Sequence, residues 1–223
     1  MAAVSSPSPL ASPRPRAGRG VRLGVYSVAI SGVGVGVALM VEADLGVAPN
    51  DVLNTGLSDQ LGVGVGTAAW ITGVIAMALA WALGRRPRLS TVVGSVIVGL
   101  SINVVLAALP TPDPLAARIG FLALGLAVIW SAITGVVASD IGIGPLELVM
   151  LGFMDRGISI RVSRWAIELT LLVLGLVLGG SAGVGTAVFA LGTGPVLALT
   201  LPPATRRMGT HLTQPTDIAS AGI

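Results

Sequence analysis

The chain contains no cysteine and no lysine, and only one of its 223 residues, His211, is a histidine. The absence of cysteine excludes disulfide bonds, thiol chemistry and cysteine metal sites. A single histidine excludes a histidine cluster within one chain. The remaining residues contain no recognisable combination of nucleophile and base, so we expect neither an enzyme nor a bound cofactor or metal.

Charged residues are also scarce. They make up 10% of the chain, and 53% of the residues are hydrophobic, with a mean hydropathy of +0.92. A soluble domain carries about 25% charged residues. The charges cluster between apolar runs, which is typical of a polytopic membrane protein. The 13 basic residues, all arginines, leave a net charge of only +3, so we interpret them as topology signals rather than as a nucleic-acid surface.

Six apolar runs approach or reach the length that crosses a bilayer, at a rise of about 1.5 Å per residue. They cover residues 23–41, 67–83, 91–109, 119–138, 165–180 and 184–201. The first run is too long for the apolar part of a signal peptide, so we expect an uncleaved span. We expect residues 110–114 to form a turn and Pro202 and Pro203 to end the last span. Residues 1–21 and 204–223 are expected to be disordered tails.

The arginines predict the orientation. With six spans and the N-terminus inside, twelve arginines lie in inner segments and only Arg118 lies outside. Inner loops of membrane proteins are enriched in positive charge. The sequence therefore predicts a multi-pass protein with both termini in the cytoplasm.

One motif occurs twice. Its two copies, residues 43–59 and 139–155, align without a gap. The matched residues are Asp44, Gly46, Pro49, Gly56 and Asp59 with Asp140, Gly142, Pro145, Gly152 and Asp155. The duplication continues at an offset of 95, which matches Gly62, Trp70, Gly84 and Thr91 with Gly157, Trp165, Gly179 and Thr186. Each unit contains three spans, an odd number, so the second unit is predicted to lie upside down relative to the first.

The predicted fold is therefore an all-α integral membrane domain of six transmembrane helices, built as two inverted three-helix repeats over residues 22–110 and 115–203. Inverted repeats are frequent in secondary transporters. They also occur in channels and scaffolds, and a duplication that serves packing alone is the alternative.

Each motif contains the signals of a bend followed by a short helix. Gly46 and Gly142 are expected to bend the backbone through positive φ angles. Pro49 and Pro145 suit the first turn of a helix, where a missing N–H is tolerated. The predicted helices, residues 49–60 and 145–156, are too short to cross a bilayer. They are either re-entrant half-helices or helices at the membrane interface.

The acidic and amide residues of these motifs are the candidate site. Asp51 and Glu147 fall in the first helical turn, where the helix dipole favours a negative charge. If both helices dip inward, their N-termini converge and the two acids bind a cation or carry protons. Asn50 and Asn54 make the first motif the more polar wall, so we expect specificity to lie with Asn50, Asp51 and Asn54, and Glu147 to serve coupling or structure.

Four further polar residues have two interpretations each. Asp44 and Asp140 are either helix caps or cation or proton ligands at the mouth of a polar cavity. Glu168 either pairs with Arg164 one helical turn earlier or is a buried, proton-linked carboxylate. Asn103 is either an interhelical hydrogen-bonding residue, the interpretation that we favour, or a ligand group.

The first motif resembles that of the YczE-type membrane proteins of the YczE/YyaS/YitT group. The similarity rests on Leu39-Met40, on Ala43-Asp44-Leu45-Gly46-Val47-Ala48-Pro49-Asn50-Asp51-Val52-Leu53 and on Gly64-Val65-Gly66-Thr67, and it extends over about residues 22–203. Many members have an aromatic residue where this chain has Asn50. The resemblance implies a protein of the bacterial plasma membrane.

The leading functional hypothesis is a small-solute or ion transporter with its pathway at the interface of the repeats. The alternative is a non-transporting scaffold or regulator of a partner complex. The expected partners are the lipid bilayer and an unidentified small solute or ion. We expect no nucleic acid partner, and homo-oligomerisation is left open.

Overall fold

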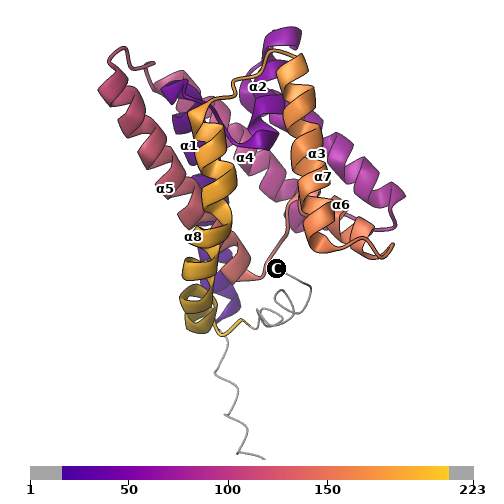
Figure 1. Cartoon of the computed structure of the whole chain (residues 1–223). Coiled ribbons are helices and arrows are strands. Elements are labelled where there is room, and N and C mark those ends of the chain that lie inside the picture. The colour runs from indigo at the N-terminus through magenta and orange to yellow at the C-terminus, as the bar shows by residue number, and fades with distance from the viewer. Residues whose placement is uncertain (1–16, 211–223) are drawn as a thin grey trace, which may run out of the picture.

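A computed structural model describes residues 17–210, and these residues form eight helices and no strand (Figure 1). The helices are α1 (Arg19–Ala43), α2 (Pro49–Leu61), α3 (Val65–Ala82), α4 (Leu89–Ala108), α5 (Leu115–Ser139), α6 (Pro145–Met154), α7 (Ile160–Val177) and α8 (Val184–Met208). Residues 1–16 and 211–223, including His211, lie outside the described part. The all-α prediction is confirmed for residues 17–210.

Five of the helices, α1, α3, α4, α5 and α8, are long and apolar enough to cross a membrane. The sequence predicts a further span where α7 lies. That helix has 18 residues, but its first half carries Arg161, Arg164 and Glu168. These charges distinguish α7 from the five candidate spans, and the sixth crossing stays a prediction. The predicted short helices exist as α2 and α6, and each begins at its proline.

Helix α8 passes through Pro202 and Pro203 and ends at Met208, so the predicted stop at these prolines is wrong. A proline removes one N–H donor, and in apolar helices the freed carbonyls find other donors. Here the freed carbonyls are those of Ala198 and Leu199, four residues before the prolines, and the helix continues past them to Met208. Helical structure also extends into both predicted tails, over residues 19–21 and 204–208.

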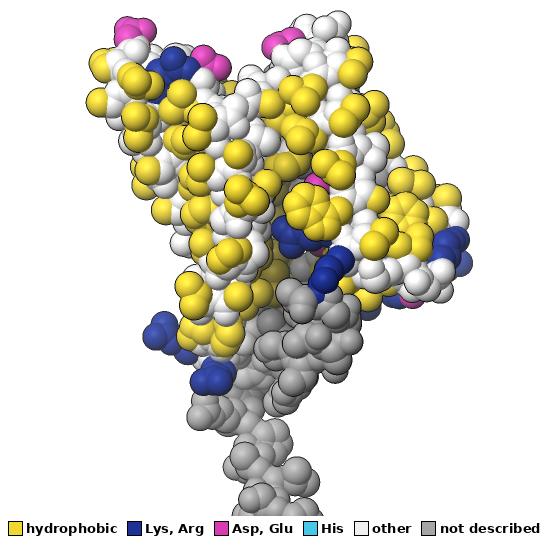
Figure 2. Space-filling model, in the orientation of Figure 1, with side chains coloured by type: hydrophobic (Ala, Val, Ile, Leu, Met, Phe, Trp, Pro, Cys, Tyr) yellow, Lys and Arg dark blue, Asp and Glu magenta, His cyan; other side chains and the backbone are white. Residues whose placement is uncertain are grey.

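The helices form two groups (Figure 1). In the first group α1 packs against α4 and α5, and α5 also packs against α8. In the second group α2 and α6 each pack against both α3 and α7. The contact between α3 and α4 joins the groups. Figure 2 shows a hollow between them, with basic and acidic side chains in it.

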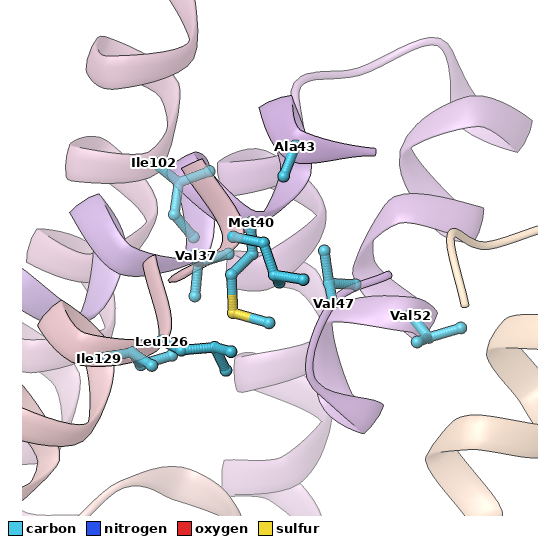
Figure 3. Close-up of a cluster of buried hydrophobic side chains, with 9 residues drawn as sticks. Val37, Met40, Ala43, Val47, Val52, Ile102, Leu126 and Ile129 are labelled. Atoms are coloured by element: carbon cyan, nitrogen blue, oxygen red, sulfur yellow. The ribbon is translucent and has the colours of Figure 1, made fainter. Parts of the chain in front are cut away.

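The main core lies where α1, α4 and α5 meet the segment that follows α1 (Figure 3). Its buried members include Met40, Val47, Val52, Ile102 and Ile129. Glycines of α1 bring the backbones together here. A Cβ atom on Gly36 would lie 2.8 Å from the Ile129 Cβ, and one on Gly32 would lie 3.2 Å from the Ala132 Cβ. This close approach positions the C-terminal end of α1, and with it the first motif.

Candidate functional site

Both motifs begin with an aspartate in the left-handed conformation. Asp44 has φ 46° and Asp140 has φ 52°, and each N–H donates to the carbonyl three residues earlier. Both residues are helix C-caps, which agrees with the cap interpretation, because aspartate tolerates this conformation better than most side chains do. Gly46 has φ 103°, as predicted, but Gly142 is not among the residues with positive φ, so the positive φ predicted for Gly142 is wrong. In the second copy Asp140 supplies the turn alone.

Each of these aspartates is bound by an arginine of the neighbouring helix. Arg118 of α5 donates through Nε to the last carbonyl of α1 at 2.8 Å and through Nη2 to the Asp44 carboxylate at 2.8 Å. Arg22 of α1 donates through Nε to the last carbonyl of α5 at 2.7 Å and through Nη2 to the Asp140 carboxylate at 3.0 Å. The N-terminal part of each helix thus binds the end of the other, so α1 and α5 are antiparallel.

Sequence reasoning missed the roles of these two arginines. Arg22 and Arg118 are 96 positions apart, the same separation as Asp44 and Asp140. That spacing is the signal that would have identified them as a matched set. The side chains of Asp44 and Asp140 are 70% and 61% exposed, so these ion pairs lie at the ends of the helices rather than in the interior.

The first turns of α2 contain a buried polar cluster. Asp51 is 6% exposed and Asn54 is fully buried. The Asn54 amide donates to Asp51 Oδ1 at 2.9 Å and accepts a hydrogen bond from the Thr72 hydroxyl of α3 at 2.7 Å. Within residues 17–210, no arginine forms an ion pair with Asp51. A buried carboxylate without a cationic partner is costly as an anion, which suits a group that takes up a proton or a cation.

Thr72 is the residue of this cluster that sequence reasoning missed. It lies in the apolar run of α3, and a polar side chain in such a run is itself a weak signal of a polar neighbour. Asn50 also belongs to the first turn of α2 and is half-buried. The structure therefore places Asn50, Asp51 and Asn54 on one short helix, with only the last two enclosed.

Backbone contacts hold α2 against α7. The Thr55 hydroxyl donates to the Asp51 carbonyl and accepts from the Ser181 N–H, both at 3.0 Å. A Cβ atom on Gly56 would lie 2.9 Å from the Gly175 carbonyl oxygen, and one on Gly175 would lie 2.5 Å from the Leu53 nitrogen. Because only glycine permits such an approach, α2 sits directly on the backbone of α7.

The second short helix lacks this polar cluster. Glu147 of α6 is exposed and folds back toward Gly144, the residue before the helix. The residues equivalent to Asn54 and Thr72 are Met150 and Ile167. Ile167 packs with an apolar cluster of α3 and α6. Asp51 and Glu147 thus occupy different environments, one buried and one exposed.

The two short helices nevertheless end in equivalent contacts. The Gln60 side chain donates to the Leu178 carbonyl at 3.2 Å, and the Arg156 side chain donates to the Leu83 carbonyl at 2.9 Å. The donors are 96 positions apart and the acceptors 95. On the second side an exposed ion pair joins Arg85 and Asp155, and the Arg85 guanidinium holds the pKa of the Asp155 carboxyl below its ordinary value.

Two of the alternatives from the sequence are decided by hydrogen bonds. Glu168 accepts from Arg164 Nε at 2.9 Å, so the pair across one helical turn is confirmed. Asn103 of α4 accepts from the Gly66 N–H at 2.9 Å and donates to the Thr67 hydroxyl at 3.2 Å. The interhelical role of Asn103 is therefore confirmed, and it joins α4 to α3.

Comparison with known proteins finds bacterial proteins that are similar to this chain. The chain is 28% identical over 176 residues to an uncharacterized protein of Haemophilus influenzae, covering 78% of this chain and 81% of the relative. It is 28% identical over 170 residues to the uncharacterized membrane protein YczE of Bacillus subtilis, covering 75% and 79%. It is 25% identical over 182 residues to the uncharacterized protein YyaS of the same organism, covering 79% and 90%.

No solved structure matches the chain. The resemblance to the YczE and YyaS proteins is thus confirmed, and the chain is a polytopic membrane protein with bacterial homologues. The model of a family of unknown function, DUF6198, matches residues 20–202, a range that contains both motifs. The chain therefore belongs to the DUF6198 family.

Proposed function

We propose that this protein transports a small solute or ion, with its pathway between two inverted repeats and with Asp51 carrying a proton or a cation. The observation that carries this proposal is the burial of Asp51 on a helix too short to cross the membrane, with no cationic partner among residues 17–210. Ionisable groups at membrane depth are costly, and they are found mainly where they bind or relay ions.

Matched contacts support the inverted-repeat arrangement. The ion pair of Arg22 with Asp140 corresponds to that of Arg118 with Asp44, with both members shifted by 96 positions. The terminal contacts of α2 and α6 correspond in the same way. A pair of equivalent helices that bind each other reciprocally is what a two-fold axis between the repeats would produce.

The two repeats differ in the polarity of their motifs, and this difference supports different roles for them. The first motif supplies the polar wall, with Asn50, Asp51 and Asn54, whereas the second has Leu146 and Met150 in place of the two asparagines. Specificity for the solute thus belongs to the first motif. Glu147, exposed and folded over the N-terminus of α6, serves the structure of its own helix.

Reconstitution into proteoliposomes tests the proposal. Uptake of a panel of small solutes and ions is measured with a pH-sensitive dye inside the vesicles, for the wild type, Asp51→Asn and Asp59→Asn. Asp59 is the matched control, because it lies exposed on the same helix. We expect Asp51→Asn to abolish the proton-linked uptake, because an amide cannot take up a proton as the carboxylate does, and Asp59→Asn to retain it. Wild-type uptake by Asp51→Asn would remove Asp51 from the mechanism.

A second candidate function is a membrane scaffold or regulator of a partner complex. Two observations favour it: α2 packs on α7 at Gly56 and Gly175, and Asn54, the partner of Asp51, is fully buried. Both suit a structural role for Asp51. In this case no solute of the panel moves, while Asp51→Asn lowers the melting temperature of the purified protein. Uptake of a solute by the wild type excludes this candidate.

A further inference from the structure

The packing of α3 on α4 depends on two glycines. A Cβ atom on Gly66 would clash with the carbonyl oxygen of Gly99, so no larger residue allows this approach. The Trp70 indole donates to the Val96 carbonyl at 3.2 Å, and Asn103 adds its two hydrogen bonds farther along α4. The seam between α3 and α4 is thus closed by backbone contact and by specific hydrogen bonds.

The equivalent helices, α7 and α8, lie apart. Within residues 17–210 they are not among the helix pairs that pack together. Trp165, the counterpart of Trp70, is 55% exposed, and Leu191, the counterpart of Val96, is 73% exposed. A Cβ atom on Gly194, the counterpart of Gly99, would meet open space. The tryptophan that closes one seam is therefore largely exposed at the other, as far as residues 17–210 show.

The sequence itself accounts for this opening. The counterpart of Gly66 is Arg161, and the counterpart of Asn103 is Ala198. A side chain at position 161 prevents the close approach that Gly66 permits, and Ala198 cannot form the hydrogen bonds of Asn103. The gap between α7 and α8 is thus a property of the chain.

The two walls of this gap differ in chemistry. The side of α3 that faces α4 carries Gly66, Trp70 and Gly73, and the same positions of α7 carry Arg161, Trp165 and Glu168. Glu168 is already paired with Arg164, whereas Arg161 has no acidic partner within ion-pair distance in the described part of the chain. The opposite wall, on α8, is apolar. Figure 2 shows the hollow between the helix groups, with charged side chains in it.

We propose that the groove between α7 and α8 is a binding site for an anionic phospholipid. Its phosphate binds Arg161, in the first turn of α7, where the guanidinium fork and the N-terminal end of the helix both attract phosphate oxygens. Its acyl chain lies along Trp165 and the apolar side of α8, filling the space that α4 fills beside α3. The lipid comes from the leaflet at the arginine-rich end of α7.

Quenching by brominated lipids tests this site. The protein is reconstituted into vesicles of phosphatidylcholine with a minor fraction of phosphatidylglycerol, and the bromines are placed on either lipid at equal bromine content. The fluorescence of Trp165 is obtained by subtracting the fluorescence of the Trp165→Phe variant from that of the protein that retains Trp165. We expect phosphatidylglycerol to be enriched about fivefold at Trp165, the effect expected of one arginine near an anionic head group.

Variants separate a specific site from general attraction. Arg161→Gln should abolish the preference for phosphatidylglycerol, whereas Arg86→Gln, which changes an exposed arginine of the α3–α4 link, should retain it. Arg161→Gly, which introduces the residue of the closed seam, should let α7 approach α8 and shield Trp165 from both lipids. Equal quenching by the two lipids in the wild type, a measurement that needs no Arg161 variant, would overturn the proposal. So would an equal loss of preference in Arg86→Gln and Arg161→Gln.

Discussion

Replacing Gly175 by alanine should loosen the whole site, because this glycine is where α2 rests on α7. The added Cβ atom would lie 2.5 Å from the Leu53 nitrogen and 2.6 Å from the Val52 carbonyl carbon. Both are backbone atoms, so no side-chain rotation relieves the contact. To restore an ordinary separation of about 3.5 Å, α2 must retreat by about 1 Å. Asp51 precedes Val52 and would move with it.

The expected net effect is a loss of stability. Overpacking of this kind costs about 1–3 kcal/mol. Exchanging glycine for alanine inside a helix returns about 0.5–1 kcal/mol. The net destabilisation is therefore about 0–2.5 kcal/mol, with a midpoint of about 1 kcal/mol. Gly194→Ala is the matched control, because Gly194 also lies inside a helix and its Cβ would meet nothing within 4 Å.

Thermal unfolding of the purified protein in detergent, followed by circular dichroism, measures this difference. Gly194→Ala should melt at or above the wild-type temperature, and Gly175→Ala should melt below it. If Gly175→Ala has the melting temperature of the wild type, α2 does not rest on the backbone of α7, and the packing argument for the Asp51 cluster fails.

Three further predictions concern the helix ends, the α3–α4 seam and the topology. Arg22→Gln and Arg118→Gln should lower the melting temperature by similar amounts, since each removes equivalent charge-assisted hydrogen bonds of about 1.5–3 kcal/mol; an effect at only one site would contradict the matched roles. Asn103→Ala should destabilise by about 1–2 kcal/mol in the same assay and increase the exposure of Trp70 to quenchers, and an unchanged Trp70 signal would show that other contacts close the seam. Asp113→Cys should be labelled by a membrane-impermeant maleimide on intact cells, because the native chain has no cysteine and the arginine distribution places this turn outside; labelling only after permeabilisation would reverse the predicted orientation.

Local signals in the sequence determined most of the helices. Apolar runs, prolines and the repeated motif predicted α2 and α6 and the regions of the long helices, because length, capping and proline act within a few residues of the chain. Helical spacing offered the pair of Arg164 with Glu168 as one of two interpretations, and the structure decided for it. The prolines of α8 were misjudged because each removes a single N–H donor, a loss that helices in apolar surroundings tolerate, and α8 continues to Met208.

Tertiary structure decided which of the equivalent residues have a special environment. Asp51 and Glu147 have the same place in their motifs, yet only Asp51 is buried. Its partner Asn54 binds Thr72 of α3, and the residues after Asp51 pack on Gly175 of α7. Trp70 and Trp165 are equivalent in sequence, yet only the indole of Trp70 has a helix to bind. The burial and the partners of a side chain depend on residues of helices that are distant in the sequence. A motif contains only one of the two residues that make each such contact.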